Sequence, residues 1–279
     1  MCYNHFIMGL KFKLISCDMD DTLLRHDGTF SKRNLDVIHE FERRGGVFMV
    51  NTGRMHASVI KRVREINLLK NSPVSSFQGA MVRESETGKM LYFKPLGYET
   101  SLQIVLDCER MGVHAQIYDL DNLYFVKNPN RYGEQYSDRC DVDYINVPSL
   151  SEYMIKTKMN NVKVIYMDEP EKVQGYMKTF REKYGHIAMF NTSALFMGEA
   201  VSKEAGKDVA CDFICARMGI SIAECMAIGD SMNDYNMLKH AGLGVAVANA
   251  QPKVLEIADY ITDTSENDGV AKVIEKFCF

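Results

Sequence analysis

A cluster of acidic residues follows directly on a short apolar run near the start of the chain, and this combination restricts the possible folds most. The run, Phe12 to Ser16, carries few charges and predicts a buried β-strand. Asp18, Asp20 and Asp21 then fall within four positions. Carboxylates packed together at a strand end repel one another and would destabilise an ordinary core. They make sense if a cation lies among them, or if two of them act as nucleophile and acid.

Two simpler interpretations compete for this stretch. One is an acidic turn that happens to follow a strand, and the local sequence leaves it open. The other is a calcium-binding EF-hand loop, which needs glycine at its sharp turn and a bidentate glutamate at its twelfth position. Those two positions hold Leu23 and Thr29 here, so the EF-hand is excluded.

The composition bears on the size of the core and on the partners. The chain has 279 residues, 46% of them hydrophobic, so it can bury a large core and has room for about two domains. Its formal net charge of −4 gives no electrostatic case for binding nucleic acid or an anionic membrane. We therefore expect neither as a partner, and we expect a monomer or a weak homo-oligomer.

The cysteines and the first residues predict a soluble cytoplasmic protein. The eight cysteines are scattered, and Cys211 and Cys215 lie one helical turn apart, which suits packing better than metal binding. Free thiols in a reducing compartment are the favoured interpretation. Residues 1–10 lack the long apolar segment and cleavage site of a signal peptide, and no stretch approaches the ~20 apolar residues of a membrane span.

Strands and helices alternate over the first part of the chain. The predicted strands are short apolar runs, and the predicted helices carry an apolar stripe on one face. In chain order these elements are a strand at 12–17, a helix at 31–44, a strand at 47–50, a helix at 55–66 and a strand at 73–77. The alternation is typical of an α/β domain with a doubly wound, Rossmann-like parallel sheet.

The pattern changes at about Glu84, where strands begin to come in adjacent pairs. Two pairs predict β-hairpins: 114–118 with 122–126, and 186–190 with 194–197 around Asn191-Thr192. The other predicted elements are a helix ending near Met111, strands near 143–147 and 162–167, and a helix from Pro170 to Tyr184. This mixture predicts an α+β domain at 84–197, inserted into a discontinuous core made of 1–83 and 198–279.

Alternation resumes after the insertion and brings a second acidic segment to a strand end. The predicted elements are a helix at 207–218, strands at 225–228 and 245–247, a helix from Pro252, a strand at 260–261 and a helix from Val270. Asp18, Asp20, Thr52 and Asp230 all lie just after predicted strands. Because ligands of open α/β sheets bind beyond the carboxyl ends of the strands, we expect these side chains to converge on one crevice.

Four motifs stand in a fixed order: Asp18-Met19-Asp20-Asp21-Thr22, Thr52-Gly53-Arg54, Lys207, and Gly229-Asp230-Ser231-Met232-Asn233-Asp234. Together they resemble the four motifs of the haloacid dehalogenase superfamily. The large insertion between the second and third motifs resembles the cap of the Cof-like phosphatases, as do the tail segments 246–250 and 268–271. The likeness covers nearly the whole core, whereas the insertion matches in position and size only.

The resemblance implies a Mg²⁺-dependent phosphatase that acts through an aspartyl-phosphate. Asp18 would be the nucleophile, attacking phosphorus in line. Asp20 would protonate the leaving alcohol and then activate the water that hydrolyses the intermediate. Mg²⁺ would be held by Asp18, by the backbone carbonyl of Asp20 and by Asp230.

The substrate phosphate would be bound by a further group of residues. The resemblance implies contacts from Thr52, Gly53 and Lys207 to the transferring phosphoryl oxygens. Lys203 lies one turn before Lys207 and is the alternative, but twelve residues separate Lys207 from Gly219, which is the usual spacing of the family. Lys203 is then a surface charge.

Four more residues have a role in the expected site. Asp234 would orient Lys207 or the waters of the metal, and Asn233 would support its loop. Arg54 and Asn249 would also contact the substrate phosphate; the simpler alternatives are a residue at a helix start and a residue in a turn.

Three residues depart from the pattern of the family without removing a catalytic role. Asp21 stands where glycine is most common and should point away from the metal. Asn51 precedes Thr52 where a smaller residue is usual. Gln78 takes the place of a common asparagine after the third strand, and its longer side chain would alter hydrogen bonding near the leaving group.

The inserted domain would close over the site as a cap and set substrate specificity. A lid of this size favours small phosphorylated metabolites over phosphoproteins, and the resemblance implies sugar phosphates, flavin mononucleotide or pyridoxal phosphate. Some side chains of the insertion could stack on or pair with such ligands and are equally expected in its core: Tyr118, Tyr124, Tyr132, Tyr136 and Arg131.

Three other functions share this type of core. A phosphomutase would transfer the phosphoryl group between sugar hydroxyls instead of to water, and it stays open. A non-catalytic sensor of phosphate or metal should have lost Asp18 or Asp20, and both are present. A transport ATPase with an aspartyl-phosphate is excluded by the lack of membrane spans.

Overall fold

The computed structural model describes residues 9–68, 72–126 and 130–279, and the chain packs as two compact units. The core unit runs to Gly53 and resumes over Ile60–Tyr92 and Gly206–Phe279. The inserted unit comprises Arg54–Val59 and Phe93–Ala205. The last two changes of unit, at 92/93 and 205/206, fall later in the chain than the boundaries expected at 83/84 and 197/198. The reason is strand pairing, because two strands after residue 80 join the core sheet and the last strand of the insertion ends at Ser202.

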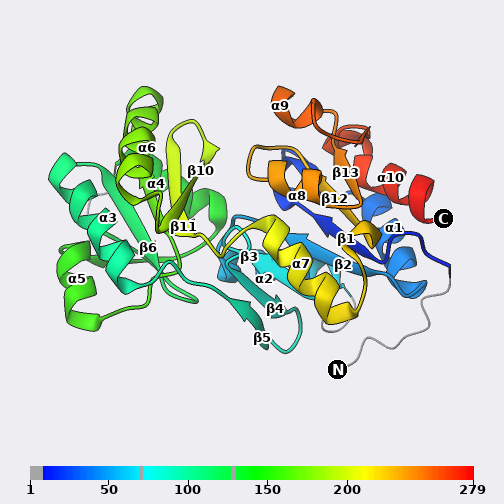
Figure 1. Cartoon of the computed structure of the whole chain (residues 1–279), viewed down its shortest axis with the longest axis horizontal. Coiled ribbons are helices and arrows are strands. Elements are labelled where there is room, and N and C mark those ends of the chain that lie inside the picture. Colours follow the sequence, from blue (N-terminus) through cyan, green and yellow to red (C-terminus); the bar gives the residue numbers. More distant parts are fainter. Residues whose placement is uncertain (1–8, 69–71, 127–129) are drawn as a thin grey trace. The chain divides into compact units, whose positions relative to one another are not determined.

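The core unit is built on an eight-stranded sheet in the order β14-β13-β12-β1-β2-β3-β4-β5 (Figure 1). Its strands are β1 (Leu14–Cys17), β2 (Val47–Asn51), β3 (Pro73–Ser76), β4 (Met81–Glu84), β5 (Met90–Phe93), β12 (Cys225–Gly229), β13 (Leu243–Ala246) and β14 (Tyr260–Ile261). From β14 to β3 every neighbouring pair is parallel, which confirms the doubly wound sheet. β4 runs antiparallel to β3, and the sequence did not predict β4 or β5.

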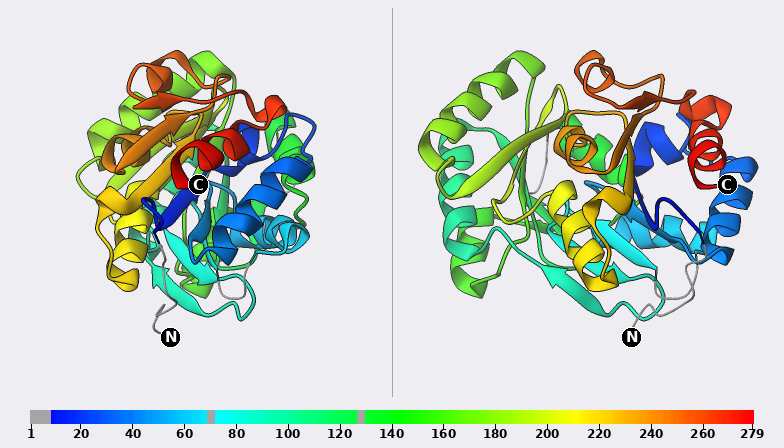
Figure 2. Two further views of the ribbon diagram at one scale, coloured as in Figure 1. Left: turned by 90° about the vertical axis from the view of Figure 1, so that its right-hand side faces the viewer. Right: turned by 45° about the vertical axis from the view of Figure 1, so that its right-hand side comes forward.

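Helices cover both faces of the core sheet. They are α1 (Lys32–Arg43), α2 (His56–Ile66), α7 (Lys207–Met218), α8 (Tyr235–His240), α9 (Pro252–Leu255) and α10 (Gly269–Cys278). The first residues of α2, up to Val59, group with the inserted unit. Figure 2 shows α1 beside α10 on one face and α7 beside α8 on the other. Helices therefore shield both sides of the sheet, and a site is expected at the carboxyl ends of its strands.

Local sequence signals explain where the core helices begin and end. The Ser31 hydroxyl accepts a hydrogen bond from the backbone N–H of Asn34 at 3.4 Å and so caps α1. Lys207 begins α7, and Gly219 ends this helix in a left-handed conformation with φ of 68°. Both boundaries agree with the sequence.

The inserted unit has a six-stranded sheet in the order β10-β11-β9-β6-β7-β8. Its strands are β6 (His114–Tyr118), β7 (Leu123–Val126), β8 (Tyr144–Val147), β9 (Val164–Met167), β10 (Ala188–Ala194) and β11 (Met197–Ser202). The β6–β7 hairpin is confirmed. The predicted turn at Asn191-Thr192 is wrong, because both residues pair with β11 and the hairpin turns at Leu195-Phe196 instead. Pairing along seven residues of β10 outweighed the local turn preference of Asn.

The helices of the inserted unit lie on both faces of its sheet. They are α3 (Tyr98–Met111), α4 (Arg131–Cys140), α5 (Leu150–Thr157) and α6 (Pro170–Tyr184), and the sequence did not predict α4 or α5. α3, α5 and α6 pack on an apolar face that includes Ala115 and Ile117 of β6. The alternate residue His114 faces the other side, where it lies against Gly133 of α4.

A buried ion pair also lies within the inserted unit. Lys163 Nζ is 3.3 Å from Glu199 Oε2, and the two side chains are 1% and 2% exposed. Lys163 Nζ further lies 5.1 Å from the centre of the Tyr118 ring. A charged pair this deep has to be matched closely in geometry to offset its loss of hydration.

Two expectations about the whole chain can be compared with the structure. The seven cysteines within the described residues are free thiols, and all are buried; Cys2 lies outside the described residues. In the part of the chain that the structure covers, the helices are all too short or too polar to span a bilayer.

Candidate active site

Strand pairing brings the predicted polar residues to one end of the core sheet. β1 lies between β12 and β2, so Asp18 has the segments that follow both neighbours beside it. The backbone N–H of Asp18 continues the ladder and donates to the carbonyl of Ile228 at 2.9 Å. Asp18, Asp230 and Thr52 thus leave three adjacent parallel strands at the same edge.

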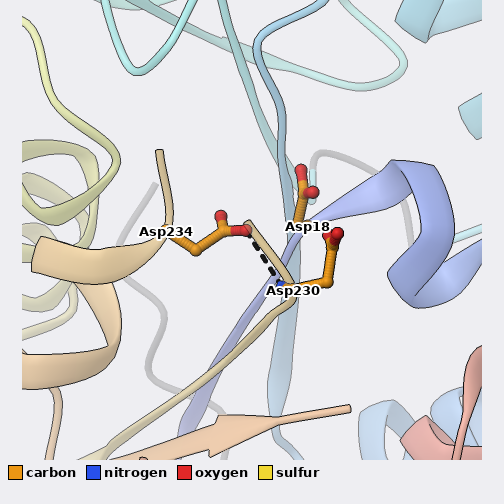
Figure 3. A group of neighbouring side chains, drawn as sticks. All are labelled: Asp18, Asp230 and Asp234. Carbon is orange, nitrogen blue, oxygen red and sulfur yellow. Dashed lines mark hydrogen bonds between the residues drawn. The ribbon is translucent and has the colours of Figure 1, made fainter. Parts of the chain in front are cut away.

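Three carboxylates meet at this edge (Figure 3). One oxygen each from Asp18, Asp230 and Asp234 lies within 4.8 Å of the others. Asp18 and Asp234 are buried, and Asp230 is half-buried. Asp234 precedes α8, so one turn after β12 brings a second carboxylate of the same motif into the cluster.

A buried lysine joins the cluster from the start of α7. Lys207 Nζ donates to Asp18 Oδ1 at 2.6 Å and to Asp234 Oδ1 at 2.7 Å, and its side chain is 1% exposed. Lys203, the alternative in the sequence, is exposed. The lysine at the carboxylates is therefore Lys207.

Asp234 also organises the loop that carries Asp230. Its Oδ2 accepts hydrogen bonds from the backbone N–H groups of Asp230 and Ser231, both at 3.1 Å. A Cβ on Gly229 would lie 2.5 Å from Asp234 Cγ, so glycine is required for the loop to close around this side chain. Both oxygens of Asp234 are thus engaged by donors of the protein itself.

The charges of the cluster shift the pKa of its members. Burial and the Asp234 carboxylate raise the pKa of Asp18 well above its usual value, although Lys207 opposes this. Burial and Asp234 likewise raise the pKa of Asp230 to about 7, against the Thr22 hydroxyl, which donates to its Oδ1 at 3.0 Å. Burial works to lower the pKa of Lys207, but Asp18 and Asp234 together raise it above its usual value, so the lysine is charged at neutral pH.

The cluster fits a small hard cation. Carboxylate oxygens are the ligands that Mg²⁺ prefers, and a cation would offset the repulsion that raises the pKa of Asp18 and Asp230. Asp18 and Asp230 would ligate it, together with the backbone carbonyl of Asp20, as the resemblance of the motifs implies. Asp234 is less suited as a ligand, because its oxygens already accept hydrogen bonds from Lys207 and from the 230–231 backbone.

The rest of the first motif forms a single turn, Met19–Leu23. Asp20 is half-buried with an extended backbone. Asp21 has a positive φ of 53°, and its Oδ1 lies 3.3 Å from Nδ1 of the exposed His26. The Asp21 carboxylate therefore faces His26, and its orientation relative to a metal stays a prediction.

The proposed phosphate-binding residues fall into two groups. Thr52 and Gly53 belong to the core unit, and Thr52 is buried at the end of β2. Arg54 groups with the inserted unit, where its Nη1 donates to Ser58 Oγ at 3.4 Å. Asn249 is exposed and uses both ends of its amide: Nδ2 donates to the Asp21 carbonyl at 2.7 Å, and Oδ1 accepts from Ser265 N–H at 2.9 Å. Contacts of these residues with phosphate stay predictions.

Two residues beside the cluster were not assigned a role from the sequence. The Thr22 hydroxyl donates to Asp230 Oδ1. The sequence did carry a signal for this role, because a polar hydroxyl stands there between Asp21 and two leucines. Asn51 is fully buried, and its Nδ2 donates to the backbone carbonyl of Lys207 at 2.9 Å and to Ser16 Oγ at 3.1 Å. No local pattern could have found that contact, because its partners come from distant segments.

The aromatic residues considered for ligand binding make contacts within the inserted unit. The Tyr118 ring is 6.4 Å from that of Tyr136, and the Tyr132 ring stacks on Phe196 at 4.8 Å. Tyr124 donates from its hydroxyl to Asp119 Oδ2 at 2.7 Å. Arg131 pairs with Glu169 at 2.9 Å. These contacts favour a role in the packing of the unit.

Comparison with known proteins gives one consistent family. A family model described as haloacid dehalogenase-like hydrolase matches residues 15–274. YxeH of Bacillus subtilis is 30% identical, with 95% of this chain and 98% of that protein covered. The 5-amino-6-(5-phospho-D-ribitylamino)uracil phosphatase YitU of the same organism is 26% identical, with 97% and 99% covered. Among solved structures, TM0651 of Thermotoga maritima is 28% identical and covers 96% of this chain and 98% of its own, with a TM-score of 0.83.

Proposed function

The chain belongs to the haloacid dehalogenase-like hydrolases and is a phosphatase of that family. From this premise we propose that it hydrolyses phosphate monoesters of small metabolites. We propose that the reaction depends on Mg²⁺ and passes through an aspartyl-phosphate. The observation that carries the proposal is the buried contact of Lys207 with both Asp18 and Asp234, beside Asp230. A lysine held against a carboxylate nucleophile can bind the phosphoryl oxygens as they arrive.

Asp18 is the nucleophile of the first step. A carboxylate oxygen of Asp18 attacks phosphorus, and the bond from phosphorus to the ester oxygen breaks on the opposite side. Asp20 donates a proton to the departing oxygen, so the product alcohol leaves neutral. The phosphoryl group is then held as an acyl phosphate on Asp18.

Asp20 acts again in the second step, now as a base. It takes a proton from a water molecule, which attacks phosphorus and releases inorganic phosphate and the Asp18 carboxylate. Throughout, Lys207 and the Thr52 hydroxyl would bind the phosphoryl oxygens, and Asp234 keeps Lys207 in place. A bound Mg²⁺ would supply positive charge that offsets repulsion between the phosphate and the carboxylates.

The substrate class follows from the relatives and from the inserted unit. YitU is named for a phosphorylated ribitylamino-uracil, a small polar metabolite. An inserted domain of this size would act as a cap that excludes proteins and supplies contacts to the leaving group. We therefore propose small phosphorylated metabolites of the sugar phosphate, flavin mononucleotide or pyridoxal phosphate type.

The test is phosphate release from a panel of such metabolites, with Mg²⁺ and with excess chelator. Release that needs the metal supports the proposal, and the order of kcat/KM over the panel identifies the preferred leaving group. No release from any substrate, by folded protein that binds Mg²⁺, would contradict it. Activity that appears only with a sugar bisphosphate activator would instead indicate the phosphomutase.

A further inference from the structure

The segment that follows β3 has an unusual backbone. Phe77, Gln78 and Gly79 have φ of 54°, 58° and 83°, so three consecutive residues are left-handed and two of them are not glycine. Such a conformation costs about 1–2 kcal/mol for each residue with a Cβ. Phe77 and Gln78 are buried, at 0% and 2% exposure. Strain of this kind persists only where the surroundings hold the backbone, which is common beside functional sites.

This segment packs against the end of β2 and the start of α7, which carry two of the proposed phosphate-binding residues, Thr52 and Lys207. The Gln78 N–H donates to the Thr52 carbonyl at 3.1 Å, at the end of β2. A Cβ on Gly79 would lie 2.0 Å from the Gly206 carbonyl oxygen and 3.0 Å from Lys207 N, so the segment packs directly on the start of α7. Thr52 and Lys207 are thus both positioned against the 77–79 backbone.

The side chain of Gln78 connects two loops. Its Oε1 accepts a hydrogen bond from Asn233 Nδ2 at 3.1 Å, in the loop between Asp230 and Asp234. On its other side, a Cβ built on Gly53 would lie 2.3 Å from Gln78 Nε2, so the amide covers the Gly53 backbone. The bridge joins the loop after β2 to the loop after β12, across the end of β1 that carries Asp18.

We infer that Gln78 is a positioning residue for the proposed phosphoryl transfer: it sets the spacing between the Thr52-Gly53 loop and the Asp230–Asp234 loop on either side of Asp18. The inference rests on the proposed function. The choice of residue supports it, because asparagine is favoured over glutamine at positive φ. Asparagine is about 1.5 Å shorter and would not reach both Gly53 and Asn233. Glutamine is less favoured at this positive φ, but its longer side chain can contact both Gly53 and Asn233.

The inference separates activity from stability in one variant. Gln78→Asn should change the unfolding temperature little, because a residue that suits the backbone better offsets the lost hydrogen bond to Asn233. The same variant should lower kcat/KM about 10- to 100-fold, mostly through kcat, because a small displacement of the reacting groups is enough for such a loss. Gln103→Asn, on the exposed face of α3, is the matched control and should change neither quantity.

The experiment measures phosphate release and thermal unfolding for the wild type, Gln78→Asn, Asn233→Ala and the double variant. If the bridge is real, Asn233→Ala costs far less kcat/KM in the Gln78→Asn background than in the wild type. Strictly additive losses, or a loss of activity that follows a lower unfolding temperature, would overturn the positioning role. An active wild type beside an equally active Gln78→Asn would overturn that role alone, whereas a wild type that releases phosphate from no substrate would overturn the proposed function.

Discussion

Each of the two units buries a lysine against carboxylate oxygen, and the two groups of side chains differ in the balance of their charges. In the core unit, Lys207 contacts Asp18 and Asp234 at 2.6 and 2.7 Å, and Asp230 completes the cluster. In the inserted unit, Lys163 pairs with Glu199 at 3.3 Å. Within the described residues, three carboxylates surround Lys207 in the core cluster, whereas Lys163 has an ion pair with one carboxylate, that of Glu199.

The difference distinguishes the proposed active site from a contact within the core of the inserted unit. Replacing a buried ion pair by apolar residues of similar size is often neutral. An excess of buried carboxylates raises their pKa and favours a bound cation, as at Asp18 and Asp230. The unbalanced cluster is therefore where ligand binding and catalysis are expected, and each prediction below tests one side of this contrast.

The largest expected effect is the loss of turnover in Asp18→Asn. Removing the nucleophile should lower kcat by at least about 10⁴-fold. Because burial and Asp234 raise the pKa of Asp18, its ionised form destabilises the metal-free fold, and the variant should unfold at the same or a higher temperature than the wild type. Phosphate release in the presence of Mg²⁺ measures the loss of turnover, and calorimetry in chelator measures the unfolding temperature.

The control for this variant is Asp36→Asn, which changes an exposed carboxylate of α1 paired with Lys32. It should leave turnover unchanged and alter the unfolding temperature little. A metal-free Asp18→Asn protein that unfolds well below the wild type would contradict the view that the core cluster is unbalanced.

The next largest effect is on stability, in the inserted unit. Lys163→Met leaves Glu199 buried without its lysine, which should cost about 3–5 kcal/mol of unfolding free energy in urea titrations. Replacing both partners in Lys163→Met/Glu199→Met should recover most of that loss. Equal losses of unfolding free energy in the single and double variants would contradict this view, because the cost would then not come from the buried charge of Glu199.

A smaller effect is expected when Mg²⁺ is added to the wild type. At a free concentration ten times Kd, binding should stabilise the fold by about 1.4 kcal/mol. For a chain of this size the unfolding temperature should rise by about 2–4 °C. Asp230→Asn should lose the rise, since it removes a proposed ligand of the core cluster. The same rise in that variant would place the Mg²⁺ elsewhere.

The smallest effect is a dependence on pH in the inserted unit. Burial lowers the pKa of His114 below its usual 6.5, although Gln116 opposes this. The unfolded chain then binds a proton more readily than the folded one, so stability is complete above pH 6.5 and falls as the pH drops toward the lowered pKa. The slope cannot exceed about 1.4 kcal/mol per pH unit for one proton.

Urea unfolding followed by circular dichroism at pH 7.5 and 5.5 measures this slope. His114→Gln should flatten it, whereas His186→Gln, an exposed histidine of the same unit, should leave it unchanged. An unchanged slope in His114→Gln would assign the acid sensitivity to other groups.

Local signals in the sequence were enough to predict the frame of the core. Apolar runs marked β1, β2, β3 and β12, and a serine cap and a terminal glycine marked α1 and α7. The predicted strand ends were enough to predict that Asp18, Thr52 and Asp230 converge, because parallel strands present their carboxyl ends at one edge of the sheet. The resemblance of four ordered motifs then indicated the family, and the match over residues 15–274 shows it.

Only the tertiary structure decided how the parts of the site hold one another. The contact of Lys207 with Asp18 joins residues 189 positions apart, and the bridge from Gln78 to Asn233 joins residues 155 apart. Such contacts leave no periodic trace in the sequence, because they depend on which strands become neighbours. For the same reason the sequence missed the antiparallel β4 and misplaced the turn between β10 and β11, where pairing outweighed local preference. The sequence by itself determined which chemical groups are available and at which edge they lie, and the fold decided their spacing and charge balance.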